Sequence, residues 1–376
     1  MPNIYSTDFS SSAYRTDTLI IGAGQAGLAA AYYAQRAGLE CILVDEQAAV
    51  GDVWNLRYDS LRLFSPAWAS SLPGWPWPGN PLRYPTGKEA AEYLRAYAAR
   101  FQFQIHHQQR VVRLQQVGNS GYRATTAMGQ QYIARQVVVC TGGFQAPKVP
   151  ALTQQLGSEV TQLHSRDYRQ PSQVPGSGPV AVVGSGNSAL QIAADLARAG
   201  RSVYLAFDER TPAMPNNALM WVMLKVGGLL RASRHRPIGA QMIARPEPVV
   251  SSDLRAVRRL PNVHLIGRAV TAPTPSSLQG QHHTTPALDA VLWATGYAPD
   301  FQWIELPVLD ASGHPVHYRG LTQFPGLAFL GLPWLDSRGS ALLEGVGRDA
   351  RRVIRALAAG RMAPVEKMNV NVAVLR

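Results

Sequence analysis

The sequence predicts an α/β protein built from two similar parallel-sheet units, because one pattern of strand, glycine turn, helix and strand occurs twice. The first copy, IIGAGQAGLAAAYYAQRAGLECILVDE, covers residues 20–46, and the second, VVGSGNSALQIAADLARAGRSVYLAFDE, covers residues 182–209. A further apolar strand that ends in Thr-Gly follows each copy, as ARQVVVCTGG (134–143) and LDAVLWATGYAPDF (288–301). This order of elements is typical of Rossmann-like units.

The glycine turn of the first copy has the spacing of a dinucleotide-binding loop. We expect Gly22 to permit the tight turn, Gly24 to let the backbone approach a pyrophosphate, and Gly27 to allow close packing of helix on strand. The phosphates would lie at the helix N-terminus. Asp45 and Glu46 end the next strand, where a ribose hydroxyl needs an acceptor. A fold that keeps this geometry without a ligand is the alternative.

The second copy has Gly184 and Gly186 in its turn and Ser188 where the third glycine would stand. Asp208 ends the following strand, where a carboxylate accepts hydrogen bonds from a ribose diol and repels a 2′-phosphate. Arg210 is close enough to pair with that phosphate. We therefore expect a dinucleotide without a 2′-phosphate, such as NADH, to be used at least as well as one with it, such as NADPH, with relaxed selectivity, if the second turn binds a nicotinamide cofactor as the family resemblance described below implies. Two alternatives stay open: Asp208 caps a turn, or the second copy is a duplication that has lost its site.

The remaining patterns suggest how the domains divide. We predict an N-terminal tail over 1–16, one discontinuous domain over 17–162 and 290–376, and a second domain over 163–289. A three-stranded meander is expected between the first copy and the strand that ends in Thr141–Gly142. The pattern of residues 324–360 predicts a strand, then a loop, and then a helix that begins near Ser340. The N-terminus of that helix could stabilise negative charge on a bound ring, unless it is an ordinary surface helix.

Composition excludes several classes of protein. The chain has 376 residues and a formal net charge of +12, but its basic stretch 231–259 lacks the aromatic residues expected of a nucleic-acid binder. The two cysteines form neither a disulfide framework nor a redox pair, and the histidines show no metal-ligand spacing. No segment is apolar enough to span a bilayer. We expect a cytoplasmic protein without metal, nucleic acid or membrane partners.

The segment VGDVWNLRYDSLRLFSPAWASSLPGWPWP (50–78) narrows the class. Together with the two glycine turns it resembles the class B flavoprotein monooxygenases, which include small bacterial flavin-containing monooxygenases and Baeyer-Villiger monooxygenases. The resemblance covers residues 16–358. It implies a glutathione-reductase-like arrangement of the two domains, with FAD in the first and NADH or NADPH in the second.

The resemblance also implies which residues hold each cofactor. Those expected at FAD are Gly22, Gly24, Gln25, Ala26, Gly27, Asp45, Glu46, Trp54, Leu63, Phe64, Ser65, Val111, Thr141, Gly142 and Ser340, with Trp54 and Leu63 to Ser65 near the flavin ring. Those expected at NAD(P)H are Gly184, Gly186, Asn187, Ser188, Phe207, Asp208, Arg210, Thr295 and Gly296. No catalytic residue is assigned.

Two stretches depart from the family pattern. Relatives have two adjacent glycines before the tryptophan, whereas this chain has Gly51 and Asp52. The family fingerprint is changed to LGSEVTQLHSRDY, in which Leu156 replaces an aromatic residue and His164 lies further from Gly157. His164 either orients the domain interface or is a solvated structural residue.

The resemblance implies an NAD(P)H-dependent FAD monooxygenase. In this family hydride reduces FAD, dioxygen adds to give a flavin 4a-(hydro)peroxide, and one oxygen passes to a small sulfide, amine or ketone. We expect sulfoxidation to be the easiest reaction and peroxide release to accompany it. The alternatives are a non-oxygenating flavin reductase or oxidase, and a redox-silent flavin-binding regulator. A homodimer is left open.

Overall fold

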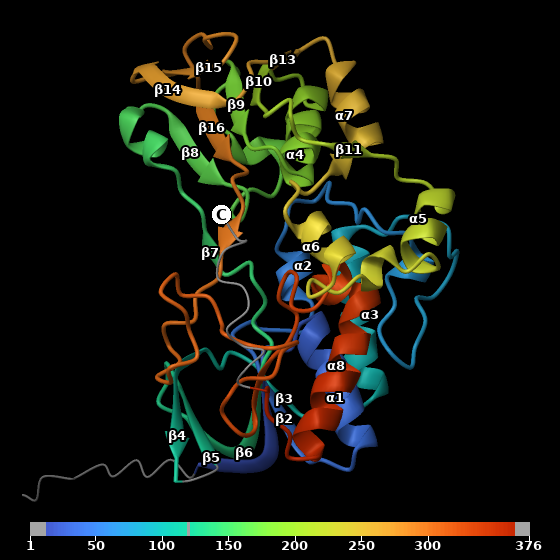
Figure 1. Cartoon of the computed structure of the whole chain (residues 1–376). Coiled ribbons are helices and arrows are strands. Elements are labelled where there is room, and N and C mark those ends of the chain that lie inside the picture. The colour runs from blue at the N-terminus through green and yellow to red at the C-terminus, as the bar shows by residue number, and fades with distance from the viewer. Residues whose placement is uncertain (1–12, 119–120, 365–376) are drawn as a thin grey trace, which may run out of the picture.

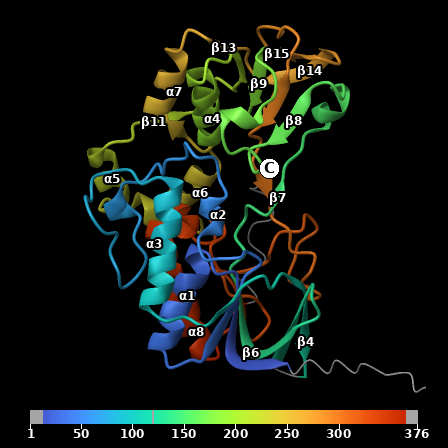
Figure 2. The ribbon, with the colours of Figure 1, turned by 180° about the vertical axis from the view of Figure 1, so that it is seen from behind.

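The computed structural model describes residues 13–118 and 121–364, which form two α/β units. In Figure 1 the unit that contains β1, α1 and α8 lies below the unit that contains β9, α4 and β16. The view from behind in Figure 2 shows the same division. Each unit has an apolar core of its own, built around one parallel sheet.

The first sheet has seven strands in the order β3-β2-β1-β6-β5-β4, with β18 also paired to β6. Its parallel members are β1 (Tyr14–Ile21), β2 (Cys41–Val44), β3 (Ile105–His106), β6 (Gln131–Val139) and β18 (Leu327–Phe329), and its antiparallel members are β4 (Val111–Val117) and β5 (Gly121–Thr126). The long strand β6 pairs with β5 near its start and with β18 near its end. The predicted meander is therefore β4, β5 and β6, and β6 is also the strand that returns to the first sheet.

The helices of the first unit pack against this sheet and against one another. They are α1 (Gln25–Arg36), α2 (Asp52–Asn55), α3 (Gly87–Arg100) and α8 (Leu343–Ala358). Figure 1 shows α1 and α8 side by side, and their buried residues share one core. Helix α3 begins with a capping box, in which Thr86 accepts the Glu89 N–H while the Glu89 carboxylate accepts the Thr86 N–H.

The second sheet repeats the plan of the first. It is parallel throughout, in the order β13-β10-β9-β16-β8, and consists of β8 (Thr161–His164), β9 (Val180–Val183), β10 (Val203–Ala206), β13 (Val263–Leu265) and β16 (Ala290–Trp293). Helices α4 (Asn187–Arg198) and α7 (Ser251–Arg258) contribute to its core. Strand β16 lies beside β9 as β6 lies beside β1, which confirms the predicted fold class.

Sheet pairing corrects the predicted domain boundaries. Strand β16 was assigned to the first domain, but it lies between β9 and β8 in the second sheet. The boundary at 162/163 divides β8, which belongs to the second sheet as a whole. Strand β1 begins at Tyr14, inside the predicted tail 1–16, of which residues 1–12 lie outside the described part of the chain. Because β16 is buried, its backbone N–H and C=O groups need hydrogen-bond partners on both sides, and β9 and β8 supply them.

Two linkers join the units. They pair with each other as the short antiparallel strands β7 (Ala146–Pro147) and β17 (Tyr297–Ala298). Each linker directly follows one of the Thr-Gly turns, so both turns lie close to the junction. The remaining strands are β11 (Ala213–Met214), β12 (Val249–Val250), β14 (Ala269–Thr274) and β15 (Ser277–Gly280); the 3₁₀ turns are η1 (Ala67–Ala69), η2 (Ala151–Gln155), η3 (Pro171–Gln173), η4 (Leu229–Arg231) and η5 (Arg338–Ala341).

The segment between β11 and β12 leaves the second unit and packs on the first. It contains α5 (Ala218–Lys225) and α6 (Pro237–Ile243), which Figure 1 shows near α2 and α3. Lys225 Nζ pairs with Glu344 at 3.2 Å, and Ser233 Oγ donates to Asp336 Oδ1 at 2.7 Å. Part of the basic stretch 231–259 is thus an interface between the units. None of the helices in residues 13–118 and 121–364 is long and apolar enough to cross a bilayer.

Candidate functional site

The first glycine turn has the geometry that its sequence predicts. Gly22 has φ +104°, and a Cβ there would lie 2.7 Å from the Cys140 carbonyl oxygen. A Cβ on Gly27 would lie 1.8 Å from the Gly22 carbonyl oxygen. A Cβ on Gly24 would meet no heavy atom within 4 Å. Gly22 and Gly27 are thus fixed by packing, whereas Gly24 borders open space.

That open space lies at the N-terminus of α1. Gly24 is the N-cap residue, with φ −74° and ψ −169°, and no side chain caps the helix. The first turn of α1 also contains no acidic residue. Gln25 and Ala26 follow the cap, and their N–H groups belong to the uncapped first turn, where an anion is stabilised. The turn therefore fits a pyrophosphate.

Asp45 is oriented toward the same turn. Its carboxylate accepts the N–H of Ala23 at 2.5 Å and the N–H of Gln47 at 2.8 Å. Burial raises the pKa of Asp45, although these two donors oppose that shift. Glu46 is exposed and lies 3.8 Å from Arg110, so the structure places Asp45 and not Glu46 at the turn.

The end of β6 and the start of β4 complete the surroundings of this turn. The close approach of Gly22 to Cys140 brings Thr141 and Gly142 beside the turn, and Gly142 has φ +71° with open space where a Cβ would be. The N–H of Gln109 donates to the Asp45 carbonyl at 2.8 Å, which places the segment before β4 next to Asp45. Val111 itself is buried in the core, so only its backbone is available to a ligand.

Ser340 lies just before α8, as expected of a helix that begins near it, and its contact with FAD stays a prediction. It is fully buried, and its hydroxyl accepts the N–H groups of Asp336 at 3.1 Å and Ser337 at 2.9 Å, which closes the turn η5. Helix α8 begins at Leu343, three residues after Ser340. Gln25 Nε2 donates to the Ala341 carbonyl at 2.6 Å, so the start of α8 does border the glycine turn. The Ser340 hydroxyl is already hydrogen-bonded within the protein. Only backbone groups at the start of α8 are therefore available to a ligand.

The Gly51–Asp52 departure has a local explanation. Gly51 has φ +86°, and a Cβ there would lie 2.6 Å from the Ala91 carbonyl oxygen, so glycine is required at this position. Asp52 is the first residue of α2, and its carboxylate accepts the Ala49 N–H at 3.0 Å and pairs with Arg95 at 3.1 Å. Asp52 therefore stabilises the start of α2, and no second glycine is needed.

The residues expected near a flavin ring differ in their environments. Leu63 is buried in the first core, and Trp54 is half-buried against it. Ser65 Oγ lies 2.8 Å from Ser70 Oγ. Phe64 is 40% exposed and stacks on Trp221 of α5, with ring centroids 6.3 Å apart. Contact of these four residues with a flavin stays a prediction.

The second glycine turn has the same design as the first. Gly184 has φ +155°, and a Cβ there would lie 2.2 Å from the Ala294 carbonyl oxygen. Gly186 borders open space and caps α4, which has no side-chain cap. Ser188 Oγ lies 3.4 Å from the Tyr58 hydroxyl, and Asn187 Oδ1 accepts the Val250 N–H at 2.8 Å. The Asn187 side chain is thus already used within the protein.

The Thr295–Gly296 turn follows β16 and lies next to Gly184, through the contact of that glycine with Ala294. The Thr295 hydroxyl donates to the Lys148 carbonyl, and Gly296 has φ +83° with open space where a Cβ would be. Phe207, by contrast, is 1% exposed in the second core, so only its backbone is available to a cofactor.

Asp208 and Arg210 form a pair on the surface beside the second turn. Arg210 Nη2 lies 2.9 Å from Asp208 Oδ2, and the Asp208 N–H donates to Ser185 Oγ at 2.8 Å. The Arg210 guanidinium lowers the pKa of Asp208 to about 2, so the carboxylate is ionised at neutral pH. Arg210 must leave Asp208 before it can bind a 2′-phosphate.

The segment 57–62 lies between the two units. The Tyr58 hydroxyl donates to Gln191 Oε1 at 3.2 Å, and the Arg62 N–H donates to the same oxygen at 3.2 Å. Arg57 lies over the ring of Tyr297, 4.8 Å from its centroid, and donates to its hydroxyl. Our sequence reasoning missed these residues, because the segment LRYDSLR has no periodicity that predicts a contact with the second unit.

His164 is a buried residue of the junction. Its Nδ1 accepts the Arg166 N–H at 3.1 Å, so Nε2 carries the proton and donates to the Gly296 carbonyl at 3.1 Å. Burial lowers the pKa of His164, which favours the neutral ring. The solvated alternative is therefore wrong: His164 joins β8 to the Thr295–Gly296 turn.

The two cysteines are unsuited to redox chemistry. Both are free; Cys41 lies on β2, and Cys140 is buried directly after β6. Burial raises the pKa of the Cys41 thiol to about 11, and burial also raises that of Cys140. Thiolates are the reactive form, so neither residue is poised to attack a disulfide. Residues 13–118 and 121–364 also contain no group of three His, Cys, Asp or Glu that could hold a metal ion.

Two uncapped helix N-termini, each beside a glycine turn and a Thr-Gly turn, define a protein with two dinucleotide-binding units. Comparison with known proteins agrees. Residues 19–225 match the family described as pyridine nucleotide-disulphide oxidoreductase, and the chain belongs to this family of oxidoreductases.

Individual relatives extend this assignment. An uncharacterized CzcO-like oxidoreductase from Geobacillus kaustophilus is 40% identical over 350 residues, which are 90% of this chain and 97% of the relative. The structure of a flavin-containing monooxygenase from Stenotrophomonas maltophilia has a TM-score of 0.75 and 29% identity, over 92% of this chain and 99% of that one. These likenesses confirm the predicted resemblance to flavin-containing monooxygenases.

A more distant structure shares the fold. The complex of OTEMO with FAD and NADP has a TM-score of 0.67 and 18% identity, over 93% of this chain and 86% of that one. At this identity the likeness shows the arrangement of the two units and nothing further.

Proposed function

We propose that the protein is a FAD- and NAD(P)H-dependent monooxygenase that transfers one oxygen atom from dioxygen to a small sulfide, amine or ketone. The observation that carries this proposal is the pair of open glycine turns at uncapped helix N-termini, joined by one segment, 57–62, that contacts both units. The structural likeness to the flavin-containing monooxygenase supports it. The cytoplasmic location remains a prediction.

The first turn would hold FAD. Gly24 leaves room for the pyrophosphate, the N-terminus of α1 supplies N–H groups, and Asp45 supplies a ribose acceptor. The start of α8 and the Thr141–Gly142 turn border the same space. Bound FAD would supply the hydride-accepting and oxygen-activating chemistry, while the chain binds it, orients it and excludes water.

The second turn would hold NADH or NADPH beside Gly186. His164 of the second unit hydrogen-bonds to the Gly296 carbonyl, and Arg57 of the first unit donates to the Tyr297 hydroxyl. Each unit therefore contributes one hydrogen bond to the linker at 296–297. His164 and Arg57 are positioning residues, because they act on the backbone and linkers around the two turns. Their arrangement would bring the nicotinamide end of one cofactor toward the flavin end of the other.

We expect the exclusion of water from the junction between the units to be incomplete. The aromatic segment 61–78 would be the wall that keeps water from the flavin, but Trp75 and Trp77 stack on Tyr93 within the first unit, with ring centroids 5.4 and 4.4 Å away. Phe64 remains 40% exposed. A reduced flavin in a wet site loses activated oxygen as hydrogen peroxide. We therefore expect oxygen transfer to be accompanied by substantial peroxide release.

Isotopically labelled dioxygen tests the proposed reaction. During turnover with NADH and a panel of thioethers and cyclic ketones, we expect the label to enter a sulfoxide or ester product, because the transferred oxygen derives from dioxygen. Mass spectrometry of the products measures this, and parallel reactions in labelled water should leave the products unlabelled. Labelled peroxide without any labelled organic product would instead favour the non-oxygenating reductase or oxidase.

Cofactor preference tests the Asp208–Arg210 pair. We expect wild type to use NADH at least as well as NADPH, and Asp208→Ala to shift the ratio of kcat/KM values about tenfold toward NADPH, because the ribose acceptor is lost and Arg210 is freed. Glu209→Ala is the matched control, since Glu209 is the adjacent exposed carboxylate. A strong wild-type preference for NADPH that Asp208→Ala leaves unchanged would remove Asp208 from the site.

A further inference from the structure

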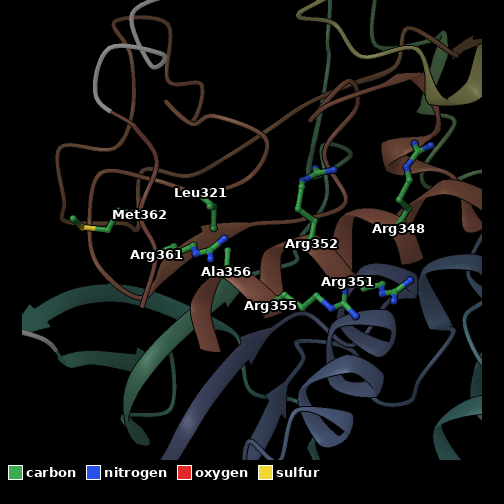
Figure 3. A pocket seen from close by; sticks show the side chains of 8 residues that line it. All are labelled: Leu321, Arg348, Arg351, Arg352, Arg355, Ala356, Arg361 and Met362. Atoms are coloured by element: carbon green, nitrogen blue, oxygen red, sulfur yellow. The ribbon is translucent and has the colours of Figure 1, made fainter. Parts of the chain in front are cut away.

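A cavity lies along α8, and none of its lining residues belongs to either glycine turn. It has a volume of about 510 Å³ and is lined by Leu321, Ala356, Met362 and five arginines, namely Arg348, Arg351, Arg352, Arg355 and Arg361. Figure 3 shows the four arginines of α8 on successive turns and Arg361 on the segment that follows. We propose that this cavity binds a small molecule that carries two or more phosphate groups.

Two of the arginines are fixed in place by buried acceptors. Arg348 Nη2 donates to Ser337 Oγ at 2.9 Å. Arg352 pairs with Asp336 at 3.0 Å and with Asp349 at 2.8 Å. Ser337, Asp336 and Asp349 are each at most 3% exposed. These guanidinium groups are therefore held before a ligand arrives, which lowers the entropic cost of binding one.

The other three arginines are exposed and lack a counter-ion among residues 13–118 and 121–364. In the described part of the chain, no carboxylate lies within ion-pair distance of Arg351, Arg355 or Arg361. Arg351 and Arg355 both act electrostatically on the hydroxyl of Tyr33 of α1, and so does Arg36. Positive charge thus accumulates where α8 packs on α1.

This arrangement is unfavourable for the helix alone. The two arginines of α8 without an ion pair, Arg351 and Arg355, stand at positions i and i+4, and like charges at this spacing destabilise a helix. The helix dipole favours a cation at Arg355, which lies in the last turn of α8. It does not explain the positive charges of Arg348 and Arg351, which lie further from the C-terminus. A bound polyanion would remove the repulsion.

The chemistry of the guanidinium groups indicates that the ligand carries phosphate. Guanidinium binds phosphate through two parallel hydrogen bonds, and three free guanidinium groups carry more positive charge than the charge of about −2 on one phosphate neutralises. The volume suits a small molecule and not a folded partner. Leu321, Ala356 and Met362 add an apolar side, where the organic part of a nucleotide could lie.

Titration calorimetry of the FAD-loaded full chain tests the site, with tripolyphosphate, ATP and citrate as probes. We expect tripolyphosphate to bind with one-to-one stoichiometry and at least about tenfold more tightly than citrate, because phosphate matches the guanidinium geometry better. Tighter binding of ATP than of tripolyphosphate would identify the source as a nucleotide, and equal binding would identify the phosphate chain alone as the recognised group.

A matched pair of double variants separates this cavity from general positive charge. Arg351→Gln with Arg355→Gln should weaken tripolyphosphate binding about tenfold or more, while leaving FAD content unchanged. Arg255→Gln with Arg258→Gln removes two exposed arginines that lie one helical turn apart on α7, and should change the affinity for tripolyphosphate little. The proposal would be overturned if both double variants weakened tripolyphosphate binding equally, or if wild type did not bind tripolyphosphate one to one. It would also be overturned if the protein bound anionic vesicles and none of the three soluble probes.

Discussion

Replacing Gly24 with valine is expected to give a folded, colourless protein. Gly24 has φ −74°, which any residue adopts, and a Cβ there meets no protein atom within 4 Å. Valine therefore fits the apo protein, and its side chain occupies the space proposed for the pyrophosphate. We expect FAD affinity to fall about a hundredfold or more, since each lost charge-assisted hydrogen bond costs about 1.5–3 kcal/mol. Flavin absorbance after dialysis, with circular dichroism for folding, measures both parts.

Gly27→Ala provides a contrast within the same turn. Its Cβ would lie 1.8 Å from the Gly22 carbonyl oxygen, so this variant should lose thermal stability as well as FAD. A Gly24→Val protein that retains FAD at wild-type affinity would contradict the proposed position of the pyrophosphate.

The equivalent change in the second turn should have a different effect. Gly186 has φ −99° and the same open side as Gly24, so Gly186→Val should fold. We expect this variant to keep its FAD and to lose reduction by NADH and NADPH about a hundredfold or more, because only the second pyrophosphate site is blocked. Photoreduction of its flavin is the control, since this does not need the nicotinamide. Loss of FAD from Gly186→Val would instead mean that the two turns are not independent sites.

The repeated parts of this fold were predictable because their signals are local. A glycine turn, an apolar strand and an amphipathic helix occur within thirty residues in each copy, so Gly22, Gly27 and Gly184 could be assigned from spacing alone. The position of β16 was predicted wrongly, because an apolar strand does not indicate which sheet supplies its neighbours. The helix near Ser340 was predicted, but the sequence did not indicate that the Ser340 hydroxyl closes a buried turn before α8.

Contacts between the units could not be predicted from the sequence. Arg57 and Tyr297 are separated by 240 residues, and Tyr58 and Gln191 by 133, and no periodicity relates them. The segment 213–250 has little pattern, because its residues are selected for packing on the first unit. The four arginines of α8 are visible in the sequence as DARRVIRALAAG with Arg348 before it, but their exposure and the cavity between them depend on the folded chain.

The central claim is that the second turn delivers hydride to a flavin held by the first. Anaerobic mixing of the FAD-loaded protein with NADH, followed by flavin absorbance in a stopped-flow instrument, tests it most directly. The account predicts rapid loss of the yellow colour in wild type and no such loss in Gly186→Val. A wild-type protein that keeps FAD and binds NADH, yet stays yellow with both NADH and NADPH, would contradict it and indicate a redox-silent regulator.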